Sequence, residues 1–150
     1  GFMDLIKNDL PRYCEEFNES RVMFHLATSP LIEQKSYKAA FSKFKISKSN
    51  LLMSIGQYEY TPFFSMSKNK SNKLKVLFPE MAIKNTQDLR DLYFDAGCFY
   101  MFNLHKVIKY NEIKLINNKE GFLLDYLEYA DLDEKKDLEI LRVKSNAKKR

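Results

Sequence analysis

Gln87 to Phe102 reads QDLRDLYFDAGCFYMF, and we expect the fold to be organised around this stretch. Its first half is polar and acidic, whereas Cys98 to Phe102 is an almost continuous run of apolar, strand-forming residues. Gly97 stands at the junction, where it permits backbone conformations that other residues disfavour. A polar approach to a buried strand is how open α/β sheets often present a ligand-contacting edge. A plain loop that enters an ordinary core strand explains the same pattern.

The composition limits the classes of protein that need to be considered. The chain has 150 residues, enough for one domain with a sizeable core, and a formal net charge of +5. Its lysines are mostly scattered rather than gathered in a stripe, so we expect no nucleic-acid partner. No apolar run approaches the ~20 residues of a membrane span, and we expect no membrane partner. Cys14 and Cys98 have no CxxC spacing, which favours a reducing, cytoplasmic location.

The pattern of apolar residues predicts alternating strands and helices. Residues 22–27 and 51–55 read as short buried strands, and a helix is expected over about 32–45. Ser29 is suited to cap that helix, with Pro30 in its first turn. A strand, a helix and a second strand in this order favour a parallel pair. The fold class predicted is therefore α/β with a mostly parallel sheet.

A hairpin is predicted to leave this sheet over about residues 58–80. Residues 63–66 and 74–78 are apolar and flank a lysine-rich polar loop, which is typical of two strands joined by a turn. The apolar side chains of these two segments are too many to leave in water, so we expect a homodimer that uses this excursion. A final helix is expected from Glu134 to about Lys144, and Pro11 should kink or break an N-terminal helical pattern.

Asp131-Leu132-Asp133 is the strongest chemical candidate in the sequence. On a strand these two carboxylates would point the same way and form an oxygen site suited to Mg²⁺ with phosphate. Alternatively, Asp133 caps the helix that follows and Asp131 is a surface acid. The two histidines, His25 and His105, have no partners at the spacing of a zinc site or a catalytic triad, which favours structural roles.

Three stretches of the chain resemble the acylneuraminate cytidylyltransferases, and among them the pseudaminic acid type most closely. The first is the run from Gln87 to Tyr100, although Phe94, Cys98 and Met101 stand where that family usually has His, Gln and Trp. The second is Ala27-Thr28-Ser29-Pro30. The third is a D-x-D-x-x-x-D-L-E pattern at Asp131, Asp133, Asp137, Leu138 and Glu139. The resemblance covers roughly residues 22–144.

This resemblance implies a partial three-layer, Rossmann-like nucleotidyltransferase fold, with residues 1–150 as a single, truncated domain and 58–80 as its dimerisation excursion. It implies that CTP and a nonulosonic acid sugar are the substrates. By position in the family motifs, Gln87, Asp95 and Tyr100 would contact the sugar. Asp131 and Asp133 would bind the catalytic Mg²⁺.

No stretch of this sequence resembles the loop that holds the CTP triphosphate in the cytidylyltransferases. The chain would then be a fragment or a shortened relative, and we expect it to transfer CMP poorly by itself. The alternative is a non-catalytic dimerisation or sugar-binding module derived from that family. A third possibility, an RNA-binding protein, lacks the aromatic stacking motifs that such proteins use.

Overall fold

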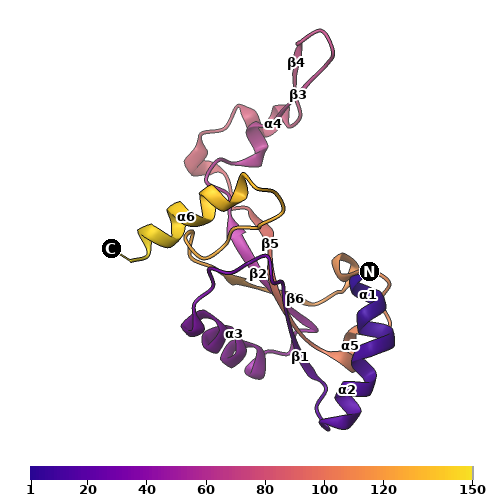
Figure 1. Ribbon diagram of the computed structural model, residues 1–150. Helices are drawn as coiled ribbons and strands as arrows, with labels where there is room; N and C mark the ends of the chain where they lie inside the picture. Colours follow the sequence, from indigo (N-terminus) through magenta and orange to yellow (C-terminus); the bar gives the residue numbers. More distant parts are fainter. Residues whose placement is uncertain (150) are drawn as a thin grey trace. The chain divides into compact units, whose positions relative to one another are not determined.

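The structure, a computed structural model, describes residues 1–149 (Figure 1). This part of the chain divides into two compact units. One unit comprises Gly1–Ile55 and the residues from Asp95 onward, and the other comprises Gly56–Phe94. Within the described residues, no helix combines the length and the apolar character needed to cross a bilayer.

The first unit is built on a four-stranded sheet with the order β1-β5-β2-β6. These strands are β1 (Arg21–His25), β2 (Leu51–Gln57), β5 (Tyr93–Asn103) and β6 (Lys119–Leu123). β1 runs antiparallel to β5, whereas β2 and β6 are parallel. The sheet is therefore mixed rather than mostly parallel. The prediction that the first two strands pair directly is wrong, because β5 lies between them.

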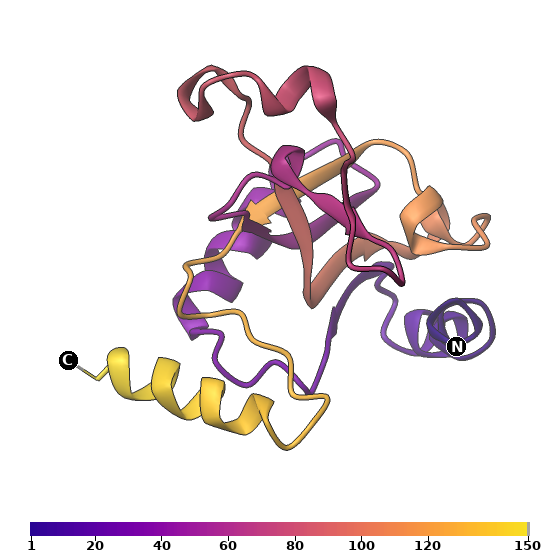
Figure 2. The same cartoon turned by 90° about the horizontal axis from the view of Figure 1, so that it is seen from above.

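The sequence of β5 explains why it takes a central position. Successive residues of a strand point to opposite faces, and both faces of β5 are apolar after Gly97. Tyr100 and Phe102 join one core cluster with residues of the N-terminal helical segment, and Phe99 and Met101 join another with residues of α3. Figure 2 shows these helices on opposite sides of the sheet. The α/β class and a layered arrangement of helix, sheet and helix are thus confirmed for this unit.

The N-terminal helical segment changes its geometry where Pro11 enters. It begins with α1 (Phe2–Asp4), continues as a π-helical segment η1 (Leu5–Asp9), and ends with α2 (Leu10–Glu16). Proline has no N–H to donate and its ring crowds the carbonyl four residues earlier, which favours the wider turn before it. Pro11 thus changes the helical geometry before it but does not break the segment, which stays helical to Glu16. Phe2 belongs to the fold, since its ring packs 4.5 Å from that of Phe24.

Four further helical elements lie in the described part of the first unit, and two of them, α3 and α6, begin two or three residues later than predicted. They are α3 (Gln34–Ile46), α5 (Leu104–Val107), η4 (Ile113–Leu115) and α6 (Asp137–Ala147). Glu33, not Ser29, is the N-cap of α3. Ser29 instead closes a turn by donating its N–H to the Leu26 carbonyl at 3.0 Å. This turn holds Ser29 away from the helix start, so the predicted cap is wrong.

The second unit contains the predicted hairpin. Its strands β3 (Met66–Lys68) and β4 (Leu74–Val76) are antiparallel, and the unit also contains η2 (Pro62–Phe64), α4 (Pro79–Ala82) and η3 (Thr86–Asp88). The Asn69 side chain closes the turn by accepting the N–H groups of Ser71 and Lys73 at 2.9 and 3.0 Å. The hairpin prediction is confirmed.

Candidate functional site

Asp95 and Tyr100 meet at the start of the apolar part of β5. The two oxygens of Asp95 accept different donors, the Gly97 N–H at 2.9 Å and the Tyr100 hydroxyl at 2.9 Å. Gly97 has a φ of +65°, a left-handed conformation that brings its N–H back onto the carboxylate. Asp95 is exposed while Tyr100 is buried. The Asp95 carboxylate is therefore accessible to solvent, and the buried Tyr100 hydroxyl fixes its position by a hydrogen bond.

The Tyr100 phenol stays protonated well above neutral pH. Burial, followed by the negative charge and hydrogen bond of Asp95, raises the pKa of this phenol above its ordinary value. The charge of Asp131 raises this pKa further. Tyr100 can therefore act as a hydrogen-bond donor here, and it is not suited to act as a base.

Ser29 and Cys98 are two buried residues close to this carboxylate. Cys98 is fully buried, and burial is the main reason that the pKa of its thiol is raised. The interaction with Ser29 lowers this pKa, and the charges of Asp131 and Asp95 raise it. The Ser29 side chain is 1% exposed, and its hydroxyl makes no hydrogen bond of ordinary length within the described residues. A buried hydroxyl without a full partner is costly unless a ligand or water completes it.

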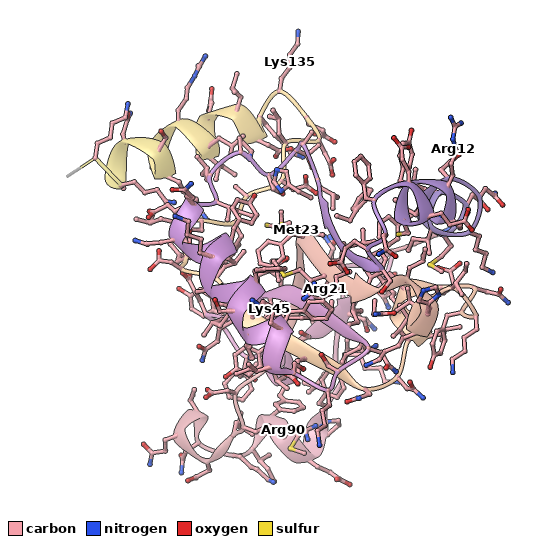
Figure 3. All side chains as sticks on the ribbon, turned by 90° about the horizontal axis from the view of Figure 1, so that it is seen from below. Arg12, Arg21, Met23, Lys45, Arg90 and Lys135 are labelled. Atoms are coloured by element: carbon pink, nitrogen blue, oxygen red, sulfur yellow. The ribbon has the colours of Figure 1, made fainter. Side chains whose placement is uncertain are left out.

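Asp131 and Asp133 lie in the exposed loop between β6 and α6, not on a strand as expected. The Leu132 N–H donates to the Thr28 carbonyl at 3.1 Å, which holds this loop against the turn that carries Ser29. Asp137 accepts the backbone N–H groups of Asp133 and Glu134 at 3.1 and 2.7 Å, so Asp137, rather than Asp133, completes the turn before α6. In the same loop, the Lys135 side chain points away from the ribbon (Figure 3).

The structure brings together some of the residues that the sequence nominated. Asp95 and Tyr100 are in contact, and Asp131 lies close enough to affect the pKa of Tyr100. Asp133 follows two residues later in the exposed loop. Gln87 lies on η3 in the other unit, where its side chain is exposed. Sequence reasoning missed Ser29 as a site residue, because Ser-Pro before a helix is the ordinary pattern of a cap.

The residues at this edge fit one kind of metal better than others. Within the described residues, no three His, Cys, Asp or Glu side chains gather as a metal-binding group. A structural zinc site needs four protein ligands, so the described residues do not supply one. Mg²⁺ is different, because it is usually bound through one or two carboxylates together with substrate phosphates and water. Asp131 and Asp133 supply such a pair of carboxylates.

Lys144 of α6 and Lys148, the C-cap residue of that helix, hold the segment that leads into the same loop. Lys144 is buried and donates to the carbonyls of Tyr126 and Tyr129 at 2.6 and 2.7 Å, with its Nζ 4.0 and 4.5 Å from the centres of the two rings. Lys148 donates to the Leu31 carbonyl at 2.6 Å and lies 4.0 Å from a carboxylate oxygen of Glu128. Because Asp137 holds the far end, α6 fixes both ends of the segment that carries Asp131.

Glu128 is the buried acid of this arrangement. It is 3% exposed, and its carboxylate accepts the Glu33 N–H at 2.9 Å and the Ser36 hydroxyl at 2.7 Å. It therefore binds the first turn of α3 to the loop after β6. Pairing and hydrogen bonding are what make a buried charge tolerable.

The histidines take part in local contacts. His25 Nδ1 lies 2.9 Å from the Tyr37 hydroxyl of α3, with the two rings edge to face. The backbone N–H of His105 donates to the Asn103 side chain at 3.1 Å, at the start of α5. Both contacts are consistent with the structural roles expected from the sequence.

Comparison with known proteins finds two relatives of the chain with assigned names. None of the known family profiles matches it. It is 30% identical over 118 residues to the pseudaminic acid cytidylyltransferases of two strains of Campylobacter jejuni, 81-176 and NCTC 11168. The match covers 78% of this chain and 50% of each relative. The chain thus spans about half the length of the curated relatives it matches, and their names support a cytidylyltransferase-type role.

Proposed function

We propose that this chain serves in the activation of a nine-carbon acidic sugar, as the sugar-binding and metal-binding portion of a cytidylyltransferase. The observation that carries this proposal is the exposed Asp95 carboxylate, which Tyr100 and Gly97 hold in place, together with the buried Ser29 hydroxyl that lacks a full hydrogen-bond partner within the described residues. The similarity to the two pseudaminic acid cytidylyltransferases gives that cluster its chemical context. The substrates proposed are CTP and a sugar of the pseudaminic or sialic acid type.

In the proposed reaction the anomeric hydroxyl of the sugar attacks the α-phosphate of CTP. A bond forms between the sugar oxygen and that phosphorus, the bond to the β-phosphate oxygen breaks, and the electrons of that bond leave with pyrophosphate. The hydroxyl proton passes to solvent. Phosphoryl transfer of this kind depends mainly on positioning and on neutralisation of charge.

The residues of the site have distinct parts in this proposal. Asp95 has free lone pairs facing solvent and accepts hydrogen bonds from sugar hydroxyls, while Tyr100 keeps the carboxylate in place. Ser29 donates its hydroxyl to a bound substrate, whereas a sugar contact by Gln87 stays a prediction from its motif alone. Asp131 and Asp133 would hold Mg²⁺. When bound, Mg²⁺ neutralises phosphate charge.

Binding and turnover together test the proposal, because the chain matches half the length of its relatives. Binding of CTP, pseudaminic acid and N-acetylneuraminic acid is measured by calorimetry with and without MgCl₂, and pyrophosphate release is followed in the same mixtures. We expect Asp95→Asn to weaken sugar binding by about 10-fold, since one charge-assisted hydrogen bond is lost. Asp131→Asn with Asp133→Asn should abolish the dependence on MgCl₂.

Asp9→Asn is the matched control, because Asp9 is exposed and lies at the end of η1. It should leave both binding constants unchanged. The proposal would be refuted if the wild-type chain did not bind an acidic sugar. Unchanged dependence on MgCl₂ in the double variant would refute the metal assignment alone.

A second candidate function is that of an assembly module that pairs with another copy of itself. It is favoured by large apolar side chains of the second unit that lie in solvent, with Ile83 87% exposed and Met66 54% exposed. Others in the unit are Phe64, Leu74, Leu77 and Phe78. Light scattering distinguishes the two candidates: a dimer without sugar binding favours the module, and a monomer at high micromolar concentration counts against it.

A further inference from the structure

We infer that Ser54 of β2 is a positioning residue for the candidate site, although it lies outside that site and is fully buried. Its hydroxyl sets the backbone of β5 at Cys98 and Phe99, and through this backbone it sets the position of Asp95, Tyr100 and Ser29. The part of this inference that concerns ligand binding rests on the proposed function. The part that concerns geometry does not.

The Ser54 hydroxyl takes the place of a strand partner. Its oxygen accepts the N–H of Cys98 at 3.1 Å and the N–H of Phe99 at 3.0 Å, and it donates to the Phe99 carbonyl at 3.2 Å. In a regular strand, successive N–H groups point to opposite neighbours. Two successive N–H groups directed at one oxygen therefore mark a bulge in β5, held by a side chain.

This bulge also changes the pairing of β5 with β1. The register pairs His25 with Phe99, so the next pair would be Leu26 with Cys98. In every second opposed pair of an antiparallel ladder the two residues exchange both hydrogen bonds, and the N–H of Leu26 marks this pair as one of that kind. Leu26 does donate to the Cys98 carbonyl at 3.0 Å, but Cys98 gives its N–H to Ser54 instead. The Leu26 carbonyl is then free to accept the Ser29 N–H at 3.0 Å.

The Ser54 hydroxyl thus fixes the backbone on two sides of the site, in β5 and in the turn after β1. On the β5 side, the bulge stands between Gly97 and Tyr100, the two residues whose hydrogen bonds hold Asp95. On the β1 side, the Leu26 turn places the Ser29 hydroxyl beside Cys98. Removal of the Ser54 hydroxyl leaves two buried N–H groups unpaired, and a return to regular pairing would compete for the Leu26 carbonyl.

The two cysteines of the chain provide a direct measurement of this geometry. Cys98 is part of the bulge and its side chain is fully buried. Cys14 is partly exposed on α2 and serves as an internal reference. Site-resolved alkylation by iodoacetamide is followed by mass spectrometry. We expect Ser54→Ala to speed alkylation of Cys98 by about 10-fold relative to Cys14, because local opening becomes easier. Ser54→Thr, which keeps a hydroxyl, should restore the slow rate.

Ser36→Ala is the matched control, since Ser36 is also a buried serine but bonds to Glu128 rather than to the backbone of β5. It should leave the alkylation rate of Cys98 relative to Cys14 unchanged. In the same variants, Ser54→Ala should weaken binding of the acidic sugar by about 10-fold, and Ser54→Thr should recover it. Unchanged Cys98 reactivity in Ser54→Ala would overturn the inference.

Hydrogen exchange of the wild-type chain gives an independent test should Ser54→Ala fail to fold. The amides of Cys98 and Phe99 should exchange as slowly as those bonded within the sheet, and rapid exchange of both would overturn the inference. If the wild-type chain binds no acidic sugar, the proposed function fails. The alkylation and exchange rates then still decide whether Ser54 sets the backbone.

Discussion

Replacement of the buried acid Glu128 by alanine should cost the protein a large share of its stability. The carboxylate accepts the Glu33 N–H and the Ser36 hydroxyl, and its Lys148 partner lies 4.0 Å away. The alanine variant leaves a buried N–H and a buried hydroxyl without their acceptor. Breaking a buried, hydrogen-bonded charge pair costs about 3–5 kcal/mol. Lys148 keeps the Leu31 carbonyl and Glu33, which places the expected loss near 3 kcal/mol.

This loss converts into a measurable shift of the melting temperature. For a chain of this size, 1 kcal/mol corresponds to about 2–4 °C, so Glu128→Ala should lower the Tm by about 6–12 °C. Glu128→Gln keeps one acceptor oxygen and should lower it by about half as much. Thermal unfolding followed by circular dichroism measures both variants.

Glu16→Ala is the control, because Glu16 is exposed at the end of α2. It should move the Tm by about 2 °C or less, as surface substitutions generally do. A Tm for Glu128→Ala within that same range would show that solvent replaces the lost acceptor. The account of Glu128 as the link between the start of α3 and the loop after β6 would then be refuted.

Two further predictions concern the edges of β5 and β1. Gly97→Ala should lower the free energy of unfolding, measured in urea titrations, by about 1–2 kcal/mol. The φ of Gly97 is +65° and no atom lies within 4 Å of the added Cβ, so only backbone strain contributes. Unchanged stability would contradict this prediction. The side chain of Arg21, and after it the backbone N–H of Arg21, lowers the pKa of Glu19 to about 2 by hydrogen bonding. This pair therefore stabilises the fold fully at a pH above the unfolded pKa of about 4.5, and its contribution is lost as the pH falls toward 2. Arg21→Ala should return the pKa of Glu19 toward 4.5 in an NMR titration, and a pKa that stays near 2 would assign the effect to the backbone amides.

Local patterns were sufficient to predict most of the elements. The spacing of Tyr37, Ala40 and Phe44 predicted α3, since apolar residues three and four apart share one face of a helix. The apolar run after Gly97 predicted the core of β5, and the polar loop between two apolar segments predicted the β3–β4 hairpin. In each case the signal lies within a few neighbouring residues.

The order of the strands could not be predicted in the same way. Strands that follow one another in sequence are neighbours in most sheets, which favoured pairing of β1 with β2. The insertion of β5 between them depends on its two apolar faces and on helices far away in sequence. No local pattern around Val22 or Leu51 carries that information.

The site shows the same division between local and distant causes. Asp95 and Tyr100 were nominated by a motif, and their hydrogen bond is local. Ser29 was read as a helix cap because its neighbours in sequence are typical of one, yet distant contacts bury it. Charged residues are ordinarily expected at the surface, so the burial of Glu128 and Lys144 had no signal in the sequence.

The central place of β5 has a consequence for how the chain folds during synthesis. Both neighbours, β1 and β2, leave the ribosome before β5 does. At roughly 5–20 residues per second, β1 waits about 4–16 s until Asn103 has been made. During that interval neither strand has the partner that will cover its edge, and an uncovered edge can pair with another nascent chain. The wait for the strand that carries Asp95 and Tyr100 is therefore a step exposed to misassembly on the ribosome.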